Sequence, residues 1–405
     1  MDGVNLEQLV QTITVLGATG SIGKSTLDVV SRHSERFRVF AITGCSQVKL
    51  LMQQAKACGS RYVVLAKEED YAEAKAIASD LNVDAEILCG QDALESVSSA
   101  PEVDIVMAAI VGAAGLKPTL AAAKAGKKIL LANKESLVMS GQLLIDIANQ
   151  NNATILPIDS EHNAIFQCLP HDYQYGNLSD SGISSILLTG SGGPFRERDL
   201  TSFSLISVEQ ACDHPNWSMG QKISVDSATM MNKGLEFIEA CRLFGVQGAD
   251  IEIVLHPQSI IHSMVRYIDG SVIAQMGNPD MRTPIAHGLT FPERIQAGVE
   301  PLDFMSLSAF TFSKPCKARY PNLYLAIEAE REGQSATTAL NAANEIAVEA
   351  FLNKRIGFTE IEKINKETLH RIEPSEVYSL ESVLEQDNGA RMIARKIVEE
   401  IQQGV

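Results

Sequence analysis

Two carboxylates separated by one residue follow an apolar run in the first half of the chain. Residues 153–158 read Ala-Thr-Ile-Leu-Pro-Ile, and Asp159-Ser160-Glu161-His162-Asn163 comes next. If this run is a buried strand, side chains at i and i+2 leave one face, so Asp159 and Glu161 point the same way just past its end. Converging carboxylates suit Mg²⁺ or Mn²⁺. Taken alone, a solvated acidic loop is the better interpretation, since acidic residues are mostly exposed.

A third carboxylate occurs in a segment whose apolar spacing predicts a helix from about Ala228. Asn232 and Glu236 then lie one turn apart on one face, with Lys233 adjacent. This group could complete a metal site and hold a phosphate. Gly234 would cost about 1 kcal/mol inside a helix relative to alanine, so it suggests close approach of a ligand or a neighbouring backbone.

Further polar clusters follow predicted strands. Residues 133–136 read Asn-Lys-Glu-Ser after an apolar strand, although an N-capped helix start with solvated charges explains them equally well. Residues 190–193, Gly-Ser-Gly-Gly, offer backbone amides as an anion-binding nest. A polar connection with His214 and Trp217 follows, typical of a lid over a substrate, with ordinary core packing of Trp217 as the alternative. His262, in an apolar run, is best interpreted as a satisfied core residue.

These clusters must be positioned by a larger scaffold, and the start of the chain indicates which one. Residues 13–23 form an apolar strand that leads into Gly17, Gly20 and Gly23 and then a predicted helix. Such glycines allow a tight turn, close approach of backbone to a pyrophosphate, and close helix packing. A phosphate-binding G-x-x-x-x-G-K-S loop would need glycine at 18, where Ala18 stands. The pattern therefore favours a dinucleotide site over an NTPase.

The second predicted strand, residues 37–43, ends in Gly44-Cys45-Ser46. An NAD site usually carries an acid here for the ribose 2′-hydroxyl, and none is present, so NADP is favoured. The nearest following cation is Lys49.

The succession of elements predicts an α/β fold with an N-terminal doubly wound, Rossmann-like dinucleotide-binding domain. Its further strands are expected at residues 62–66, 87–88, 103–111, 128–132 and 154–158, with Ala-rich helices such as 117–125 between them. A central α/β catalytic domain with a mobile lid loop and a C-terminal helical bundle complete the chain. We expect an NADPH-binding domain over 1–156, a catalytic domain over 157–290, a linker over 291–321 and a helical domain over 322–405.

Composition limits the partners. The 405 residues imply two or three domains, and the net charge of −16 argues against a nucleic-acid or anionic-membrane partner. The seven cysteines have no C-x-x-C spacing and read as reduced thiols. No apolar run reaches the length of a membrane span. We expect a cytoplasmic protein, and a processed organelle protein would look similar.

In order, these motifs resemble those of the 1-deoxy-D-xylulose 5-phosphate reductoisomerase family. The motifs that carry the resemblance are Gly17–Gly23, Ala132–Ser136, Asp159–Asn163, Leu188–Phe195, His214–Gly220, Met231–Glu236 and Leu340–Glu345. The resemblance implies conversion of 1-deoxy-D-xylulose 5-phosphate to 2-C-methyl-D-erythritol 4-phosphate in non-mevalonate isoprenoid synthesis. It also implies NADPH, a divalent cation (Mg²⁺, Mn²⁺ or Co²⁺), a homodimer, and inhibition by fosmidomycin, whose hydroxamate chelates the metal.

Site residues follow from the same resemblance. The metal ligands would be Asp159, Glu161 and Glu236. The substrate would be bound by Lys134, Ser160, Glu161, Ser191, His214, Ser227, Asn232, Lys233 and Glu236, with Ser191, Ser227, Asn232 and Lys233 on its phosphate. Lys134, Glu161 and His214 would be catalytic. NADPH would contact Thr19, Gly20, Ser21, Ile22, Gly44, Ser46, Asn133, Glu135 and Gly220, and the lid would carry His214, Trp217 and Met219.

One departure concerns the end of the second strand, where the family commonly has Gly-Arg-Asn or Gly-Lys-Asn. This chain has Gly44-Cys45-Ser46, which predicts weaker discrimination against NADH. Two rival functions are another metal-assisted NADP-dependent oxidoreductase of a phosphorylated sugar, and a non-catalytic NADP-sensing module. The sensor is disfavoured because it needs neither a carboxylate triad nor a phosphate site.

Overall fold

The structure is a computed structural model that describes residues 10–214 and 220–404. The chain forms two compact units. The first unit comprises residues 1–133, 146–159 and 280–300, and the second comprises 134–145, 160–279 and 301–405. No helix in the described part of the chain is both long and apolar enough to cross a membrane.

The first unit is built on a parallel seven-stranded sheet in the order β4-β3-β2-β1-β5-β6-β7. Its strands are β1 (Gln11–Leu16), β2 (Phe37–Gly44), β3 (Tyr62–Leu65), β4 (Glu86–Cys89), β5 (Ile105–Ala108), β6 (Lys128–Leu131) and β7 (Thr154–Pro157). The central strands are apolar along their length because they are covered on both faces, as β5 is buried at all four residues. The order reverses between β1 and β5, which makes the crevice there the expected ligand site. The predicted Rossmann-like fold is confirmed.

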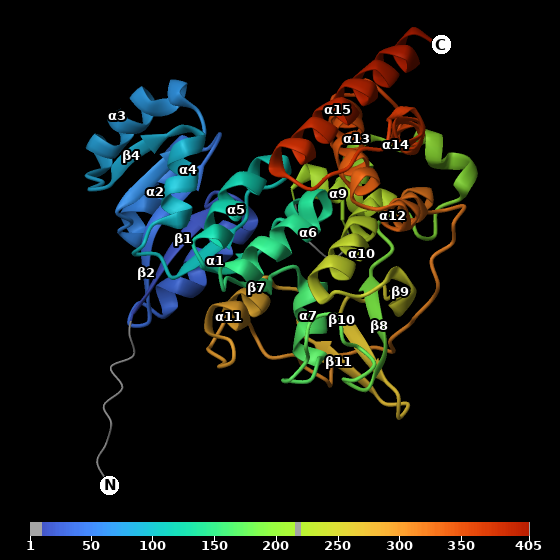
Figure 1. Ribbon diagram of the computed structural model, residues 1–405, viewed down its shortest axis with the longest axis horizontal. Coiled ribbons are helices and arrows are strands. Elements are labelled where there is room, and N and C mark those ends of the chain that lie inside the picture. Colours follow the sequence, from blue (N-terminus) through green and yellow to red (C-terminus); the bar gives the residue numbers. More distant parts are fainter. Residues whose placement is uncertain (1–9, 215–219, 405) are drawn as a thin grey trace. The chain divides into compact units, whose positions relative to one another are not determined.

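The crossover elements of the first unit are coloured from blue to teal in Figure 1. They are α1 (Ser21–Arg32), α2 (Val48–Cys58), η1 (Glu68–Asp70), α3 (Tyr71–Leu81), α4 (Gly90–Ser99), η2 (Ala113–Gly115) and α5 (Leu116–Lys124), to which the later α11 (Arg282–Thr290) is added. Helix α6 (Lys134–Gln150) changes direction at Ser140, whose φ of −141° is not helical.

The second unit contains a mixed four-stranded sheet in the order β11-β10-β8-β9. Its strands are β8 (Ile183–Gly190), β9 (Ile251–Leu255), β10 (Ile261–Tyr267) and β11 (Val272–Met276), and its first helices are α7 (Ser160–Cys168), α8 (Val208–Ala211), α9 (Gln221–Thr229) and α10 (Met231–Phe244), with 3₁₀ turns η3 (Leu200–Leu205) and η4 (Gly248–Asp250). One apolar core joins this sheet to α10 and includes Leu188, Leu235 and Val265.

Four helices end the chain, as the sequence predicted, and Figure 1 shows them in orange and red. They are α12 (Pro321–Glu332), α13 (Gln334–Leu352), α14 (Glu360–Arg371) and α15 (Leu380–Gln403). Their core continues into α9 through residues such as Val225, Ala347 and Ile397. This packing fixes α9, whose residues belong to the candidate site.

Candidate functional site

The glycine loop of the first unit lies at the reversal of strand order. Gly17 follows β1 with a φ of +77°, and a Cβ there would lie 2.6 Å from the carbonyl oxygen of Ala109, just after β5. A Cβ on Gly23 would overlap the Gly17 carbonyl oxygen. The predicted tight turn and close helix packing are therefore present. Gly20 is the N-cap of α1 without a side-chain cap, so first-turn amides face the crevice. This cradle fits the pyrophosphate of a dinucleotide.

Most residues predicted to contact the dinucleotide come together at the carboxyl edge of this sheet. Thr19, Gly20, Ser21 and Ile22 belong to the loop between β1 and α1, and Gly44 and Ser46 stand at and just after the end of β2. The Asn133 side chain, after β6, donates to the carbonyl of Gly112 at 3.0 Å and to that of Ile110. It thereby joins the ends of β5 and β6. Glu135 and Gly220 belong to the second unit.

Asp159 and Glu161 come together, but by a different local geometry from the one predicted. Strand β7 ends at Pro157 and α7 begins at Ser160, so Glu161 lies in the first turn of a helix and the i, i+2 alternation of a strand does not apply. The predicted alternation fails because the chain enters helix α7 at Ser160, after only two residues beyond the end of β7 at Pro157. Asp159, Glu161 and Glu236 nevertheless each present an oxygen atom, all within 4.8 Å of one another. Three hard oxygen donors fit a Mg²⁺-like cation.

Helix α10 supplies the third carboxylate and its neighbours. It begins at Met231, after Met230 in a left-handed conformation (φ 59°), so the predicted start at Ala228 was wrong and Ser227 lies on the preceding α9. The predicted shared face of Asn232 and Glu236 is confirmed, because the Asn232 side chain donates to Glu236 Oε1. A Cβ on Gly234 would lie 2.5 Å from that of Ala326, so this glycine admits a neighbouring helix.

Two lysines neutralise the carboxylates of the second unit. Lys134 Nζ donates to Asn232 Oδ1 at 2.9 Å and to Glu236 Oε1 at 3.0 Å. Lys233 Nζ donates to Glu161 Oε1 at 2.7 Å and also to Glu236. Burial opposes the charge of Lys233, but Glu161 and Glu236 outweigh it and raise its pKa. Lys134 is only 6% exposed, so the solvated-charge interpretation of residues 133–136 was wrong.

The predicted phosphate residues lie around the loop after β8. Gly192 and Gly193 have positive φ values, and the Gly193 amide donates to Ser191 Oγ at 3.1 Å. His214 Nε2 lies 3.2 Å from the same oxygen. A Cβ on Gly193 would lie 2.6 Å from the Ser227 carbonyl oxygen, which places α9 against this loop.

Lys233 connects this loop to the carboxylates, because its Cε would lie 2.7 Å from a Cβ on Gly190. Burial lowers the pKa of His214, and the negative charge of Glu161 opposes that shift. The proposed lid residues Trp217 and Met219 lie outside the described residues. His262 is 8% exposed and its Nε2 lies 3.2 Å from the Gly277 carbonyl oxygen, in keeping with a core role.

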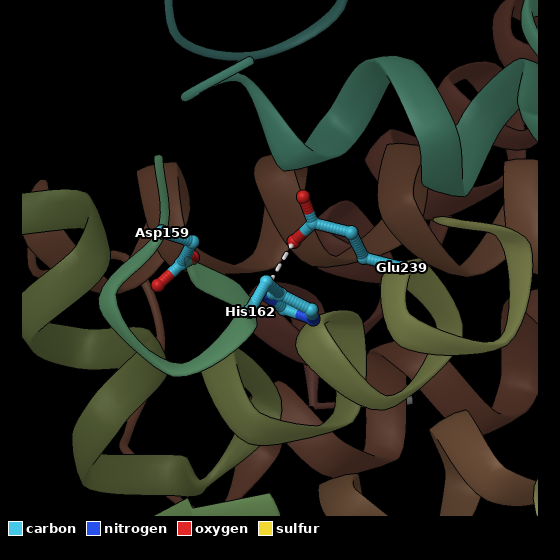
Figure 2. A group of neighbouring side chains, drawn as sticks. All are labelled: Asp159, His162 and Glu239. Carbon is cyan, nitrogen blue, oxygen red and sulfur yellow. Dashed lines mark ion pairs between the residues drawn. The ribbon is translucent and has the colours of Figure 1, made fainter. Parts of the chain in front are cut away.

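Sequence reasoning gave no role to a histidine and a glutamate beside the carboxylates. His162 Nε2 lies 2.8 Å from the Glu236 carbonyl oxygen, which can only accept, and His162 Nδ1 lies 3.3 Å from Glu239 Oε2. Burial lowers the pKa of His162 to about 4. Figure 2 shows this pair with Asp159, whose carboxylate lies within 4.8 Å of both. His162 thus ties α7, which carries Glu161, to α10, which carries Glu236.

Lys222, near the start of α9, is a second residue to which the sequence gave no role. Its ammonium group lies 2.8 Å from Glu135 Oε1 and 2.9 Å from Asp226 Oδ2. Asp226 also accepts a hydrogen bond from Asn344 at 2.7 Å, which links α9 to α13. Burial opposes the charge of Lys222, but Asp226 and Glu135 raise its pKa. The i, i+4 spacing of Lys222 and Asp226 was the available sequence signal.

Comparison with known proteins gives consistent matches along the chain. The profile of 1-deoxy-D-xylulose 5-phosphate reductoisomerase matches residues 13–141, and two profiles of its C-terminal domains match 155–244 and 276–393. The protein of that name from Glaesserella parasuis is 58% identical over 390 residues, covering 95% of this chain and 98% of the relative. That of Haemophilus ducreyi is 57% identical over 393 residues, with the same coverage.

Solved structures agree. A crystal structure of DOX-P reductoisomerase with NADPH, fosmidomycin and magnesium has 48% identity and a TM-score of 0.92, over 97% of this chain and 100% of that one. The Zymomonas mobilis enzyme with NADPH has 47% identity and a TM-score of 0.88, over 96% and 99%.

Proposed function

This chain belongs to the 1-deoxy-D-xylulose 5-phosphate reductoisomerase family, and we infer from this that it converts 1-deoxy-D-xylulose 5-phosphate to 2-C-methyl-D-erythritol 4-phosphate. Its cofactors are NADPH and magnesium. The observation that carries the assignment to this chain's own residues is the meeting of Asp159, Glu161 and Glu236, with Lys134 and Lys233 on the same carboxylates. The glycine loop for a dinucleotide and the site of three carboxylates are both features that a metal-dependent reductase of a phosphorylated sugar requires.

The metal ligands of this proposal are Asp159, Glu161 and Glu236, which present only oxygen donors. A divalent cation held there stabilises negative charge that develops on substrate oxygens. Ser160 Oγ donates to Glu161 Oε2 at 2.7 Å, which leaves Oε1 facing Lys233 and orients the carboxylate. Ser160 and Glu161 are also proposed to contact the substrate.

Lys134 is the proposed proton-handling residue at the substrate hydroxyls. Its ammonium group donates to Asn232 at 2.9 Å and to Glu236 at 3.0 Å. The Lys134 side chain as a whole is 8% exposed. Such a fixed ammonium group donates hydrogen bonds to a substrate oxygen with little reorganisation. NADPH supplies the hydride for the reductive step.

The substrate phosphate is proposed to lie against Ser191, Ser227, Asn232 and Lys233, with His214 beside the substrate. Support comes from the Ser191 loop, where two glycines with positive φ and an amide directed at Ser191 form a nest-like turn. The phosphate is remote from the reacting carbons, so its binding energy can be used to orient them.

The proposed NADPH contacts are Thr19, Gly20, Ser21, Ile22, Gly44, Ser46, Asn133, Glu135 and Gly220. The uncapped N-terminus of α1 supports a pyrophosphate position there. We propose that residues 1–156 chiefly bind the cofactor, that 157–290 carry the metal and substrate residues, that 291–321 connect, and that 322–405 support the catalytic residues.

A homodimer is also proposed. The hairpin of β10 and β11 exposes Ile268, Val272 and Ile273 at 74%, 47% and 47%. Adjacent residues of a strand point to opposite faces, so both faces of β11 are uncovered at this point. A second copy of the chain is the partner we propose for this surface. A cytoplasmic location is proposed on the strength of seven free cysteines.

The test is to follow NADPH oxidation with 1-deoxy-D-xylulose 5-phosphate, with and without EDTA, against a second phosphorylated ketose as a control substrate. We expect turnover with the first substrate, abolished by EDTA and restored by Mg²⁺. Glu161→Gln should stop turnover and leave NADPH binding nearly intact. A fully active Glu161→Gln variant would remove Glu161 from the metal site, and turnover that resists EDTA would overturn the metal requirement.

A further inference from the structure

The end of β2 has no charge with which to meet the 2′-phosphate of NADPH. In folds of this kind the ribose of the cofactor is read near that strand end, and a nearby basic residue accommodates the phosphate. Here Cys45 and Ser46 follow Gly44, and both are exposed. The positive charge must therefore come from another element, and the strand that pairs with β2 leads to a candidate.

Strand β3 lies directly beside β2 and runs parallel to it. Gly44 pairs with Leu65, and the Ala66 amide donates to the Gly44 carbonyl at 3.0 Å. Ser46 and Lys67 each follow that last pair by two residues, in the connecting segments that leave the carboxyl ends of two neighbouring strands. Among residues 45–47 and 66–68, only Lys67 is basic.

We propose that Lys67 supplies the positive charge that binds the 2′-phosphate of NADPH and so determines the preference for NADPH over NADH. The proposal rests on the proposed function, because it takes NADPH as the cofactor. We favour Lys67 over Lys49, the nearest cation after β2 in the sequence, because Lys67 follows the end of the strand that pairs directly with β2.

The charged groups around Lys67 support its role as the cation of this site. Lys67 Nζ donates to Glu69 Oε1 at 3.2 Å, which raises the pKa of Lys67, and the charges of Glu69 and Asp70 contribute in the same sense. Lys67 therefore remains a protonated cation at neutral pH. Burial raises the pKa of Cys89, at the end of β4 on the other side of β3, and the charges of Glu68 and Asp70 add to that shift.

The pair between Lys67 and Glu69 does not prevent phosphate binding. The two side chains are 53% and 72% exposed, and exposed ion pairs contribute little to stability. A phosphate can thus take the place of Glu69 on the ammonium group.

The experiment measures dissociation constants of NADPH and NADH for the full-length chain, by nicotinamide fluorescence without substrate. Lys67→Gln should weaken NADPH binding roughly tenfold or more, as expected for a lost charge-assisted contact, and leave NADH binding unchanged. Glu69→Gln should strengthen NADPH binding, since it frees Lys67. Lys49→Gln is the matched control and should change neither constant more than about twofold.

Gain of function provides an independent arm. Cys45→Arg in the Lys67→Gln background should restore most of the NADPH affinity by placing a cation on the adjacent strand end. Equal loss for NADPH and NADH in Lys67→Gln, no loss, or a loss in Lys49→Gln instead would overturn the proposal. A wild-type chain that binds neither cofactor would instead contradict the proposed function, so the two failures can be told apart.

Discussion

The glycine loop of the first unit and the carboxylate site of the second unit are built on opposite principles. The loop works by lacking side chains: Gly17 has a φ of +77° and no room for a Cβ beside Ala109. The carboxylate site works by concentrating charge, since Glu236 is 1% exposed and has bonds to Lys134, Lys233 and Asn232. The loop should therefore be sensitive to volume, and the carboxylate site to charge.

This difference has an energetic reason. Backbone amides of a loop keep their dipoles whatever small residue is present, so only shape can fail. Buried charges instead need compensation from one another, and removal of one partner leaves another uncompensated. The two sites can thus be separated by substitutions that keep shape and change charge, or the reverse.

The largest expected effect is that of Glu236→Gln, which keeps shape and removes charge. It takes away one proposed metal ligand and leaves Lys134 and Lys233 with less negative charge. We expect kcat to fall by about a thousandfold or more. Titration calorimetry should show weaker Mg²⁺ binding, while NADPH affinity stays within about twofold. Retention of near-normal turnover would contradict a charge-sensitive site.

Lys222→Met tests the charge principle through stability. Glu135 and Asp226 would lose the cation between them, and Glu135 has a lowered pKa because the charge and hydrogen bond of Lys222 outweigh its burial. The Lys222 side chain is 25% exposed, so we expect a loss of about 2 kcal/mol, less than for a fully buried pair. Urea unfolding would measure it.

The control is Lys317→Met, which breaks an ion pair whose side chains are 68% and 51% exposed. We expect at most about 0.5 kcal/mol there. An equal loss of unfolding free energy in the two variants would mean that burial does not strengthen the ion pairs of Lys222 relative to the exposed pair of Lys317.

The sequence predicted the parts of these sites that depend on local pattern. Strand ends followed by polar residues placed Asn133 and the Gly17 loop on one sheet edge, because carboxyl ends of parallel strands meet there. Helical spacing placed Asn232 above Glu236. These inferences needed only periodicity and glycine chemistry.

The missed parts depend on packing. Met230 has a left-handed conformation that divides α9 from α10, and nothing about methionine predicts this. The pair of His162 and Glu239 joins residues 77 positions apart (239 − 162), so no local spacing reveals it. That Lys67 follows a strand adjacent to the one that leads to Ser46 is known only from the pairing of β2 with β3.

Gly17→Ala tests the volume principle in the loop. The new Cβ would meet the Ala109 carbonyl at 2.6 Å with φ at +77°, so we expect a loss of about 1–3 kcal/mol in stability and weaker NADPH binding. Gly20→Ala is the matched variant, because its nearest neighbour lies at 3.4 Å and its φ is −73°. It should lose less stability, about 0.5 kcal/mol, because alanine is a poorer N-cap than glycine. A Gly17→Ala protein as stable as Gly20→Ala would refute the volume principle.

The smallest effect concerns pH and shows that the first unit, despite its uncharged loop, has a titrating group of its own. His287 on α11 is 7% exposed, and burial, then Arg294 and Lys128, lower its pKa to about 4 from 6.5. The unfolded chain therefore binds this proton first, and stability falls as pH drops from about 6.5 towards 4. Between pH 7 and about 5.5 the expected loss is about 1 kcal/mol. Calorimetric melting of wild type and His287→Gln should show a shallower pH dependence of stability in the variant. Identical slopes would mean that His287 does not titrate as proposed, so that the first unit lacks this charge as well.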